Sequence, residues 1–297
     1  MKSRALYSIE AARGWLPWAV LVPFLSIAFV AAPLLAATSV LESFHLADAH
    51  GDPIGRIGLI AFLSLPFTLI GLVVLIWVRF VERRSMATIG LVRPGWAPAF
   101  AWGHGIGIVT ITLVVASVWI AGGAQAAGYG SVFAAPVDLF YVGVLLACFV
   151  LQSGVEELLM RGWLLSALAR KLNVGLAVAI TSLVFAVLHY GPQQPVLVTL
   201  NMLLFSVFTC AWALRAGSIW GVMGWHAGWN WMLATGFELP VTGLDAQVPA
   251  LLVKLTPQGS AILTGGGQGP EGSIICTIFF VAATWLLAVR PFRKREA

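Results

Sequence analysis

Long apolar runs, separated by short polar or glycine-rich segments, dominate the pattern of this chain. A run of about 20 apolar residues is long enough for a helix to cross a bilayer. Such runs stand at 15–37, 57–79, 99–121, 138–160, 174–190, 195–214, 218–236 and 273–289. The fifth is short and ends at Gly191-Pro192. The pattern predicts an all-α, polytopic membrane protein, a bundle of about eight transmembrane helices.

Composition agrees with a membrane protein. The 297 residues are 60% hydrophobic and 10% charged, with a mean hydropathy of +0.93, whereas a soluble domain carries about 25% charged residues. We expect one integral membrane domain over 1–297, with a long outer loop at 237–272. The first run, of about 23 apolar residues, is long for a signal peptide, so we expect it to be retained. The three cysteines lie far apart in apolar runs and predict neither disulfides nor a metal site.

Basic residues gather in one alternating set of loops. These are Lys2, Arg4, Arg13, Arg79, Arg83, Arg84, Arg93, Arg170, Lys171, Arg215, Arg290, Arg293, Lys294 and Arg295. The opposite loops hold only Arg56 and Lys254, among several acids. The positive-inside rule then places both termini in the cytoplasm of a multi-pass protein, in a cell membrane that we expect to be a bacterial inner membrane. The net charge of +5 is thereby explained without nucleic acid as a partner.

A charged cluster interrupts the fourth apolar run. Glu156, Glu157 and Arg161 stand there, although each ionisable group in the middle of a membrane helix costs on the order of 3 kcal/mol. Glu157 and Arg161 are four residues apart, so they share a helix face and can pair. Glu156 is turned about 100° away from Glu157. One acid is thus explained by pairing, and Glu156 is left for a reaction.

A second cluster, Phe185-Ala-Val-Leu-His189, ends the fifth run. The turn between the fourth and fifth helices is expected near 172–173. Glu156 and His189 are then each about 16 residues, or roughly 24 Å, from that turn along their helices. In an antiparallel helix pair the two side chains therefore lie at one level and can meet.

The third cluster is His226-Ala-Gly-Trp-Asn230 in the seventh run. His226 and Asn230 are one helical turn apart and project from one stripe. The neighbouring tryptophans are expected to pack or to form an interfacial belt. Asn201 is expected to bond between helices, and His104 to be structural. Three glycines of this run allow a neighbouring helix to approach closely: Gly221, Gly224 and Gly228.

These groups can hydrolyse an amide. A carboxylate beside a histidine, Glu156 with His189, can deprotonate a water molecule. An imidazole and a carboxamide, His226 with Asn230, can donate hydrogen bonds to the oxyanion that forms. Glu156, His189 and His226 are also an acceptable zinc ligand set, although no His-Glu-x-x-His motif is present.

The ordered motif set resembles the CPBP family of intramembrane endopeptidases. This family, also called Abi, contains the CAAX proteases and bacteriocin-processing enzymes, among them the Ras-converting CAAX prenyl endopeptidase. Its pattern is Glu-Glu-x-x-x-Arg, Phe-x-x-x-His and His-x-x-x-Asn on separate helices. Here these motifs stand as Glu156-Glu157-Leu-Leu-Met-Arg161, Phe185-Ala-Val-Leu-His189 and His226-Ala-Gly-Trp-Asn230, within a catalytic core at 138–236 formed by helices 4 to 7.

The resemblance implies a glutamate-dependent endopeptidase that needs no metal or other cofactor. Glu156 and His189 would activate water, and His226 and Asn230 would form the oxyanion hole. The supporting residues would be Glu157, Arg161 and Phe185. The substrate implied is a membrane-bound or lipidated peptide or protein.

Three alternatives stay open at the level of sequence. A zinc-dependent intramembrane protease would use the same residues. A non-catalytic membrane protein, such as an immunity or scaffold protein, would keep the site without its chemistry. A proton-coupled transporter would also place acids and histidines in the membrane, but it predicts inverted repeats, and the hydropathy pattern shows none.

Overall fold

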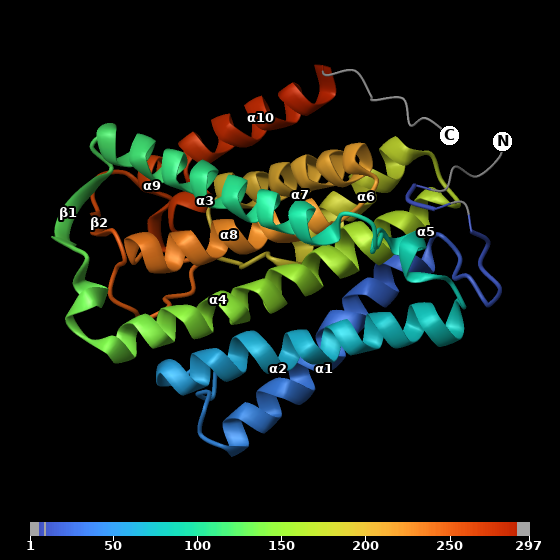
Figure 1. Cartoon of the computed structure of the whole chain (residues 1–297), viewed down its shortest axis with the longest axis horizontal. Coiled ribbons are helices and arrows are strands. Elements are labelled where there is room, and N and C mark those ends of the chain that lie inside the picture. Colours follow the sequence, from blue (N-terminus) through green and yellow to red (C-terminus); the bar gives the residue numbers. More distant parts are fainter. Residues whose placement is uncertain (1–5, 9, 290–297) are drawn as a thin grey trace.

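We analysed a computed structural model that describes residues 6–8 and 10–289. Six basic residues that were used to orient the chain lie outside these ranges: Lys2, Arg4, Arg290, Arg293, Lys294 and Arg295. Helices dominate the described part and run mostly along one long axis (Figure 1). The prediction of a helical membrane protein is therefore confirmed.

Each predicted apolar run contains a helix, but the first helix begins at Leu21 and ends at Ser43, about six residues later at each end than the predicted 15–37. Five helical units are long and apolar enough to cross a membrane. Three are single helices, Leu21–Ser43 (α1), Trp96–Ile120 (α3) and Val196–Ala216 (α7). The other two are composite: Gly55–Val81 consists of Gly55–Ile76 (α2) and Trp77–Val81 (η1), and Pro136–Ala169 consists of Pro136–Glu157 (α4), Leu158–Leu164 (η4) and Leu165–Ala169 (α5). Two apolar helices are shorter, Val174–Leu188 (α6) and Ile274–Val289 (α10). The remaining run is Trp220–Phe237 (α8). Length and composition thus support five crossings directly.

The turn between α5 and α6 falls where the sequence predicts it. Leu165–Ala169 (α5) ends just before it, and Asn173 caps Val174–Leu188 (α6) by accepting a hydrogen bond from the Leu176 amide at 2.9 Å. Helix α6 ends one residue before His189. The short helix therefore presents His189 at its carboxyl end, beside the long α4 unit.

Helix α8 lies at the centre of the bundle, and all of its residues except Trp220 and Trp231 are buried. It touches α3 almost backbone to backbone. A Cβ atom at Gly224 would lie 2.1 Å from the Phe100 carbonyl oxygen, and one at Gly228 would lie 2.2 Å from that of His104. These distances leave no room for a side chain, so the predicted role of the glycines in close helix packing is confirmed. The buried Trp225 and Trp229 serve as packing.

A small sheet at one end of the bundle corrects the all-α expectation (Figure 1). Ala124–Tyr129 (β1) pairs antiparallel with Val253–Pro257 (β2), with Ala124 opposite Pro257. The two strands are far apart in sequence, so no local pattern announces their pairing. Outside the helices these backbones still need hydrogen-bond partners, and each strand supplies them to the other.

The long 237–272 segment is largely ordered rather than a bare loop. After β2 it forms Ala261–Thr264 (α9), Gly266–Gln268 (η5) and Pro270–Gly272 (η6). Two more short turns lie elsewhere, Met86–Ile89 (η2) and Ser131–Ala134 (η3). The three cysteines are buried and free. The 237–272 segment is thus held in place and can shape what lies beneath it.

Candidate active site

The four predicted catalytic side chains meet at one cavity of about 470 Å³. Glu156 enters from α4, His189 from the end of α6, and His226 and Asn230 from α8. Phe185 lines the same cavity. Segments 30 to 70 residues apart along the chain thus converge, as the helix-pair geometry predicts for Glu156 and His189.

Glu156 and His189 face each other across a short gap. Glu156 Oε2 lies 3.9 Å from His189 Nε2, which is too long for a hydrogen bond but suits one bridging water molecule. His189 Nδ1 lies 2.9 Å from the Phe185 carbonyl oxygen, which can only accept, so Nδ1 carries a proton there. In the neutral tautomer with this Nδ1 proton, Nε2 keeps a lone pair on the side of Glu156.

Glu157 has two partners rather than one. Its Oε1 accepts a hydrogen bond from Arg161 Nη1 at 3.1 Å, as the i, i+4 spacing predicts. The same oxygen lies 3.0 Å from His226 Nδ1. The side chains of Glu157 and Arg161 are fully buried, so this carboxylate positions His226 in a place that water does not reach. The contact with His226 is absent from the sequence-based prediction.

This contact restricts the protonation of His226. Because the Glu157 carboxylate accepts, His226 Nδ1 must donate, and a neutral ring then has no proton on Nε2. His226 Nε2 is also 4.0 Å from Glu156 Oε2. His226 can therefore donate a hydrogen bond into the cavity only as a cation, with both nitrogens protonated.

Gln152 is a further residue of the site that the sequence analysis did not single out. Its Nε2 donates to Glu156 Oε1, and its Oε1 accepts from Asn230 Nδ2 at 3.1 Å. Asn230 Nδ2 also lies 3.3 Å from the hydroxyl of Ser153. Gln152 thus connects the two halves of the site. Its position four residues before Glu156, on the same helix face, is the signal that would have identified it.

Aromatic rings hold the polar groups in place. The ring of Phe185 stacks on His189 with centroids 4.2 Å apart, and the Arg161 guanidinium lies 4.6 Å from the Phe185 centroid. Phe205 of α7 stacks on Phe185 at 5.2 Å and meets His226 edge-on at 4.9 Å. These contacts explain the phenylalanine of the second motif, since it orients His189 and covers Arg161.

The helix widens directly after the two acids. Leu158–Leu164 (η4) is a π-helix and carries Arg161. Such segments are rare and often mark functional sites. The buried hydroxyl of Tyr7 donates to the Arg161 carbonyl oxygen at 2.7 Å. The amino-terminal segment therefore supports the backbone on which the charged pair stands.

The 237–272 segment forms a wall of the cavity. Val241, Thr242, Gly243 and Leu244 line it from one turn of this segment. Thr242 has a left-handed φ of 47°, which is uncommon for a β-branched residue and marks local strain. This turn must therefore be held by other contacts.

Glu271 holds this turn against the helices. One oxygen of its carboxylate accepts from Trp229 Nε1 at 2.9 Å, and the other accepts from the Thr242 amide and hydroxyl at 2.8 and 2.9 Å. The side-chain amide of Asn201 in α7 donates to the backbone carbonyl oxygens of Glu271 and Ser273. Its Oδ1 accepts from the hydroxyl of Thr277 in α10 at 2.6 Å, so its predicted interhelical role is confirmed. Sequence reasoning missed Glu271, which stands in a glycine-rich stretch without periodic pattern.

Replacing Glu271 with Gln is expected to weaken the attachment of the 237–272 segment to the helices. A carboxamide cannot accept on both sides, so at least one contact to Trp229 or Thr242 is lost, at a cost of about 1–3 kcal/mol. Limited proteolysis should then cleave the 237–272 segment faster in Glu271→Gln than in the wild-type protein. Glu42→Gln, at an exposed position of α1, serves as the control. Equal cleavage rates in the two variants would contradict this role of Glu271.

Glu156, His189 and His226 are also the side chains that the sequence offers as zinc ligands. Among residues 6–8 and 10–289, no group of three or more His, Cys, Asp or Glu side chains is arranged to hold a metal ion. His226 Nδ1 is engaged by Glu157, and His189 Nδ1 by a backbone carbonyl. Only the Nε2 atoms of the two rings face Glu156.

The segment that carries this site is similar to a known protein family. Residues 138–232, about a third of the chain, match the family model described as type II CAAX prenyl endopeptidase Rce1-like. The resemblance to the CAAX protease family is confirmed. This Rce1-like segment contains all three motifs and closely follows the core predicted at 138–236.

The Rce1-like segment also fits the rest of the structure. Its match supports, at the level of the family, a CAAX-type intramembrane protease that acts on a protein or peptide in a membrane environment. The apolar helices place the chain in a membrane as well. No curated protein and no solved structure matched the chain in these comparisons.

Proposed function

We propose that the protein is an intramembrane endopeptidase that hydrolyses a peptide bond with water activated by Glu156 and His189. The observation that carries this proposal is the convergence of Glu156, His189, His226 and Asn230 on one cavity within the Rce1-like segment. Phe185, Glu157 and Arg161 support these residues. Neither a metal nor another cofactor takes part in this proposal.

In the reaction, a water molecule between Glu156 Oε2 and His189 Nε2 gives up a proton to one of them as its oxygen bonds to the substrate carbonyl carbon. The carbonyl oxygen becomes an oxyanion, to which His226 Nε2 and Asn230 Nδ2 donate. When the carbon–nitrogen bond breaks, the stored proton passes to the leaving amine. The products are a carboxylic acid and an amine, so atoms and charge balance.

The proposed roles assign a charge to each group of the site. Glu156 and Glu157 as carboxylates, with Arg161 and a doubly protonated His226, sum to zero when His189 is neutral. His226 is then the cation that can donate from Nε2. Asn230 must release one of its contacts to Gln152 or Ser153 to do the same. Gln152 is thus a positioning residue for both Glu156 and Asn230.

Eight crossings with both termini in the cytoplasm are the topology that we propose. This topology is supported by contacts between loops that it places on the same side of the membrane. The amide of Arg13 lies 3.5 Å from the Arg83 carbonyl oxygen, and Arg170 Nη2 lies 3.3 Å from that of Glu10. At the other end β1 pairs with β2. The domain arrangement proposed is therefore one membrane domain, with the 138–236 core under the 237–272 segment.

This topology determines from which side a substrate arrives. The loop residues that line the cavity, among them Asp52, Thr242 and Gln268, all belong to loops on the side opposite the basic ones. The cavity also carries apolar walls from Phe62, Phe67 and Met202. We therefore assign as substrate a membrane-bound or lipidated peptide or protein, cleaved from the non-cytoplasmic side of a bacterial inner membrane.

The test compares peptides released from membranes that contain either the wild-type protein or Glu156→Gln. Mass spectrometry should find fragments that depend on Glu156, and labelled substrates added to sealed, oriented vesicles show from which side cleavage occurs. Identical fragments from both membranes would refute the proposal. Activity that disappears with a chelator and returns with Zn²⁺ would instead favour the zinc-dependent alternative.

A non-catalytic immunity or scaffold protein is the other alternative. It predicts that Glu156→Gln still supplies the cellular function of the wild type. A protein that serves only as a scaffold has no need for Glu156 to lie 3.9 Å from an imidazole nitrogen with a free lone pair. This geometry is the observation that favours the enzyme.

A further inference from the structure

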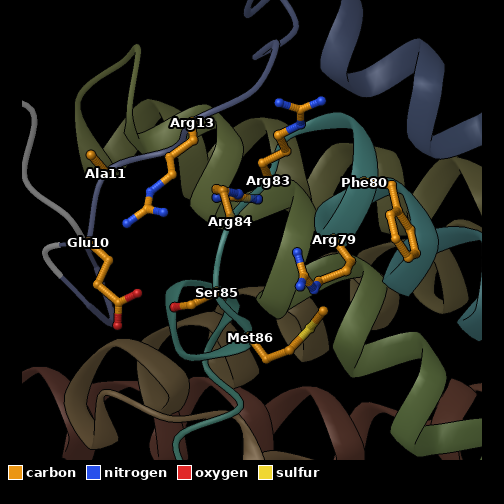
Figure 2. A pocket seen from close by; sticks show the side chains of 9 residues that line it. All are labelled: Glu10, Ala11, Arg13, Arg79, Phe80, Arg83, Arg84, Ser85 and Met86. Carbon is orange, nitrogen blue, oxygen red and sulfur yellow. The ribbon is translucent and has the colours of Figure 1, made fainter.

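A second cavity, of about 780 Å³, lies at the end of the bundle remote from the β1–β2 sheet. It is lined by four arginines, Arg13, Arg79, Arg83 and Arg84, and by Glu10, Ala11, Phe80, Ser85 and Met86. Figure 2 shows these side chains, with the four arginines between Glu10 on one side and Phe80 on the other. Four cations and one acid make this a strongly basic cavity, and no part of the proposed reaction uses it.

The backbone brings the arginines together. The amino-terminal segment runs beside the turn after η1, where the amides of Gly14 and Trp15 donate to the carbonyl oxygens of Glu82 and Val81 at 3.0 and 3.1 Å. A Cβ atom at residue 14 would lie 2.1 Å from the Val81 oxygen, so only glycine permits this approach. Arg83 adopts a left-handed φ of 49°. Arg13 is thus fixed beside arginines that lie about 70 residues later.

Arg84 forms the buried base of this cavity. Its Nε lies 2.6 Å from Glu82 Oε2 and its Nη1 donates to Ser166 at 3.2 Å, but Nη2 has no partner among the described residues. Burial lowers the pKa of the Arg84 guanidinium; Glu82 opposes this shift, and the like charge of Arg170 adds to it. An anion bound in the cavity would offset the two effects that disfavour the charged guanidinium, its burial and the like charge of Arg170.

The other three arginines of the cavity share a single acid. Glu82 is fully occupied by Arg84 and by the indoles of Trp77 and Trp163, which donate to its Oε1 at 3.0 and 2.8 Å. The side chains of Arg13, Arg79 and Arg83 are exposed and face only Glu10 as an acid in the cavity lining. Guanidinium groups grouped in this way suit the oxygens of a phosphate, which they bind in pairs.

The surroundings place this site at the surface of a membrane. The cavity lies where the α2–η1 unit ends, and the exposed Phe80 lines it. Two more exposed aromatic residues, Trp15 and Trp18, follow Arg13 in the chain, just before α1. Such rings are typical of the boundary between lipid and water. Basic pockets at the cytoplasmic ends of membrane helices bind anionic head groups. A phosphate here would therefore also have an apolar neighbour for an acyl chain.

We propose that the cavity formed by Arg13, Arg79, Arg83 and Arg84 binds the phosphate of an anionic phospholipid. Binding would also brace the catalytic helix, because Glu82 and Arg84 contact Trp163 and Ser166 of the α4–η4–α5 unit. The lipid would stabilise the folded protein by mass action. This inference does not depend on peptidase activity.

The test uses the full-length protein in neutral detergent and measures its melting temperature with added phosphatidylglycerol, phosphatidylcholine or inorganic phosphate. The variant Arg79→Gln/Arg83→Gln removes two exposed cations, and Arg93→Gln removes an exposed one outside the cavity. Phosphatidylglycerol should raise the melting temperature of wild type and Arg93→Gln more than phosphatidylcholine does. In the double variant its apparent affinity should fall about 25-fold, at about 1 kcal/mol per cation.

Two results would overturn the proposal. One is a phosphatidylglycerol effect that survives in the double variant, and the other is an equal loss in Arg93→Gln, which indicates adsorption by net charge alone. If inorganic phosphate reproduces the shift in wild type but not in the double variant, the site takes a free phosphate group. If only phosphatidylglycerol acts, the ligand is the lipid. The Arg13→Gln variant repeats the test at an exposed position should the double variant fold poorly.

Discussion

Glu156→Gln is expected to lower peptide hydrolysis by about 10²–10⁴-fold, the usual contribution of a general base. The carboxamide has nearly the same shape and still accepts the hydrogen bond from Gln152, but it cannot take a proton from water. Folding should be unaffected, since Glu156 is only partly buried in the wall of the cavity. Turnover of a quenched membrane peptide and the melting temperature in detergent are the two measurements.

The control for this experiment is Glu42→Gln, which changes an exposed acid of α1 and should leave both measurements unchanged. Retained turnover in Glu156→Gln would remove Glu156 from the reaction. A large fall in melting temperature would show that Glu156 serves the fold instead. The alanine variant adds little here, because it also breaks the contact with Gln152.

Arg161→Leu is expected to lower the free energy of unfolding by about 3–5 kcal/mol, because the buried Glu157 carboxylate loses its guanidinium partner and keeps only the contact with His226. The two side chains are fully buried and 3.1 Å apart, so neither charge can reach water. The double variant Glu157→Leu/Arg161→Leu should recover a large part of the loss, since it removes both charges. Chemical denaturation in detergent measures these differences.

Comparing the single variant Arg161→Leu with the double variant Glu157→Leu/Arg161→Leu also separates an effect on stability from an effect on activity. The double variant should stay inactive even where its stability recovers, because His226 Nδ1 has lost the carboxylate that positions it. Arg93→Leu, at an exposed site, is the matched control. Unchanged stability in Arg161→Leu would contradict the buried pair, and full activity in the double variant would contradict the role of Glu157 in positioning His226.

How much of this site was predictable depends on sequence separation. Glu157 and Arg161 pair as expected because their spacing alone brings them to one helix face. Glu156 and His189 meet as expected because one short turn separates two antiparallel helices. Both predictions use only the rise and the period of a helix. Such local geometry is contained in the sequence pattern.

Other contacts were beyond prediction. The Glu157–His226 contact joins residues 69 positions apart, and it depends on how α8 is rotated against α4. That rotation follows from the close approach of α8 to α3 at Gly224 and Gly228. The sequence indicates that some helix comes close to these glycines, but not which one.

The sequence by itself determined the helices and the membrane setting, and it supplied the list of candidate side chains, because hydropathy and helical period are local properties. Only the tertiary structure decided that Glu157 serves His226 as well as Arg161, that Gln152 connects Glu156 to Asn230, and that Glu271 holds a wall over the site. These contacts require a particular rotation and depth for each helix. Packing among many side chains sets those values together, so no single segment of the chain encodes them.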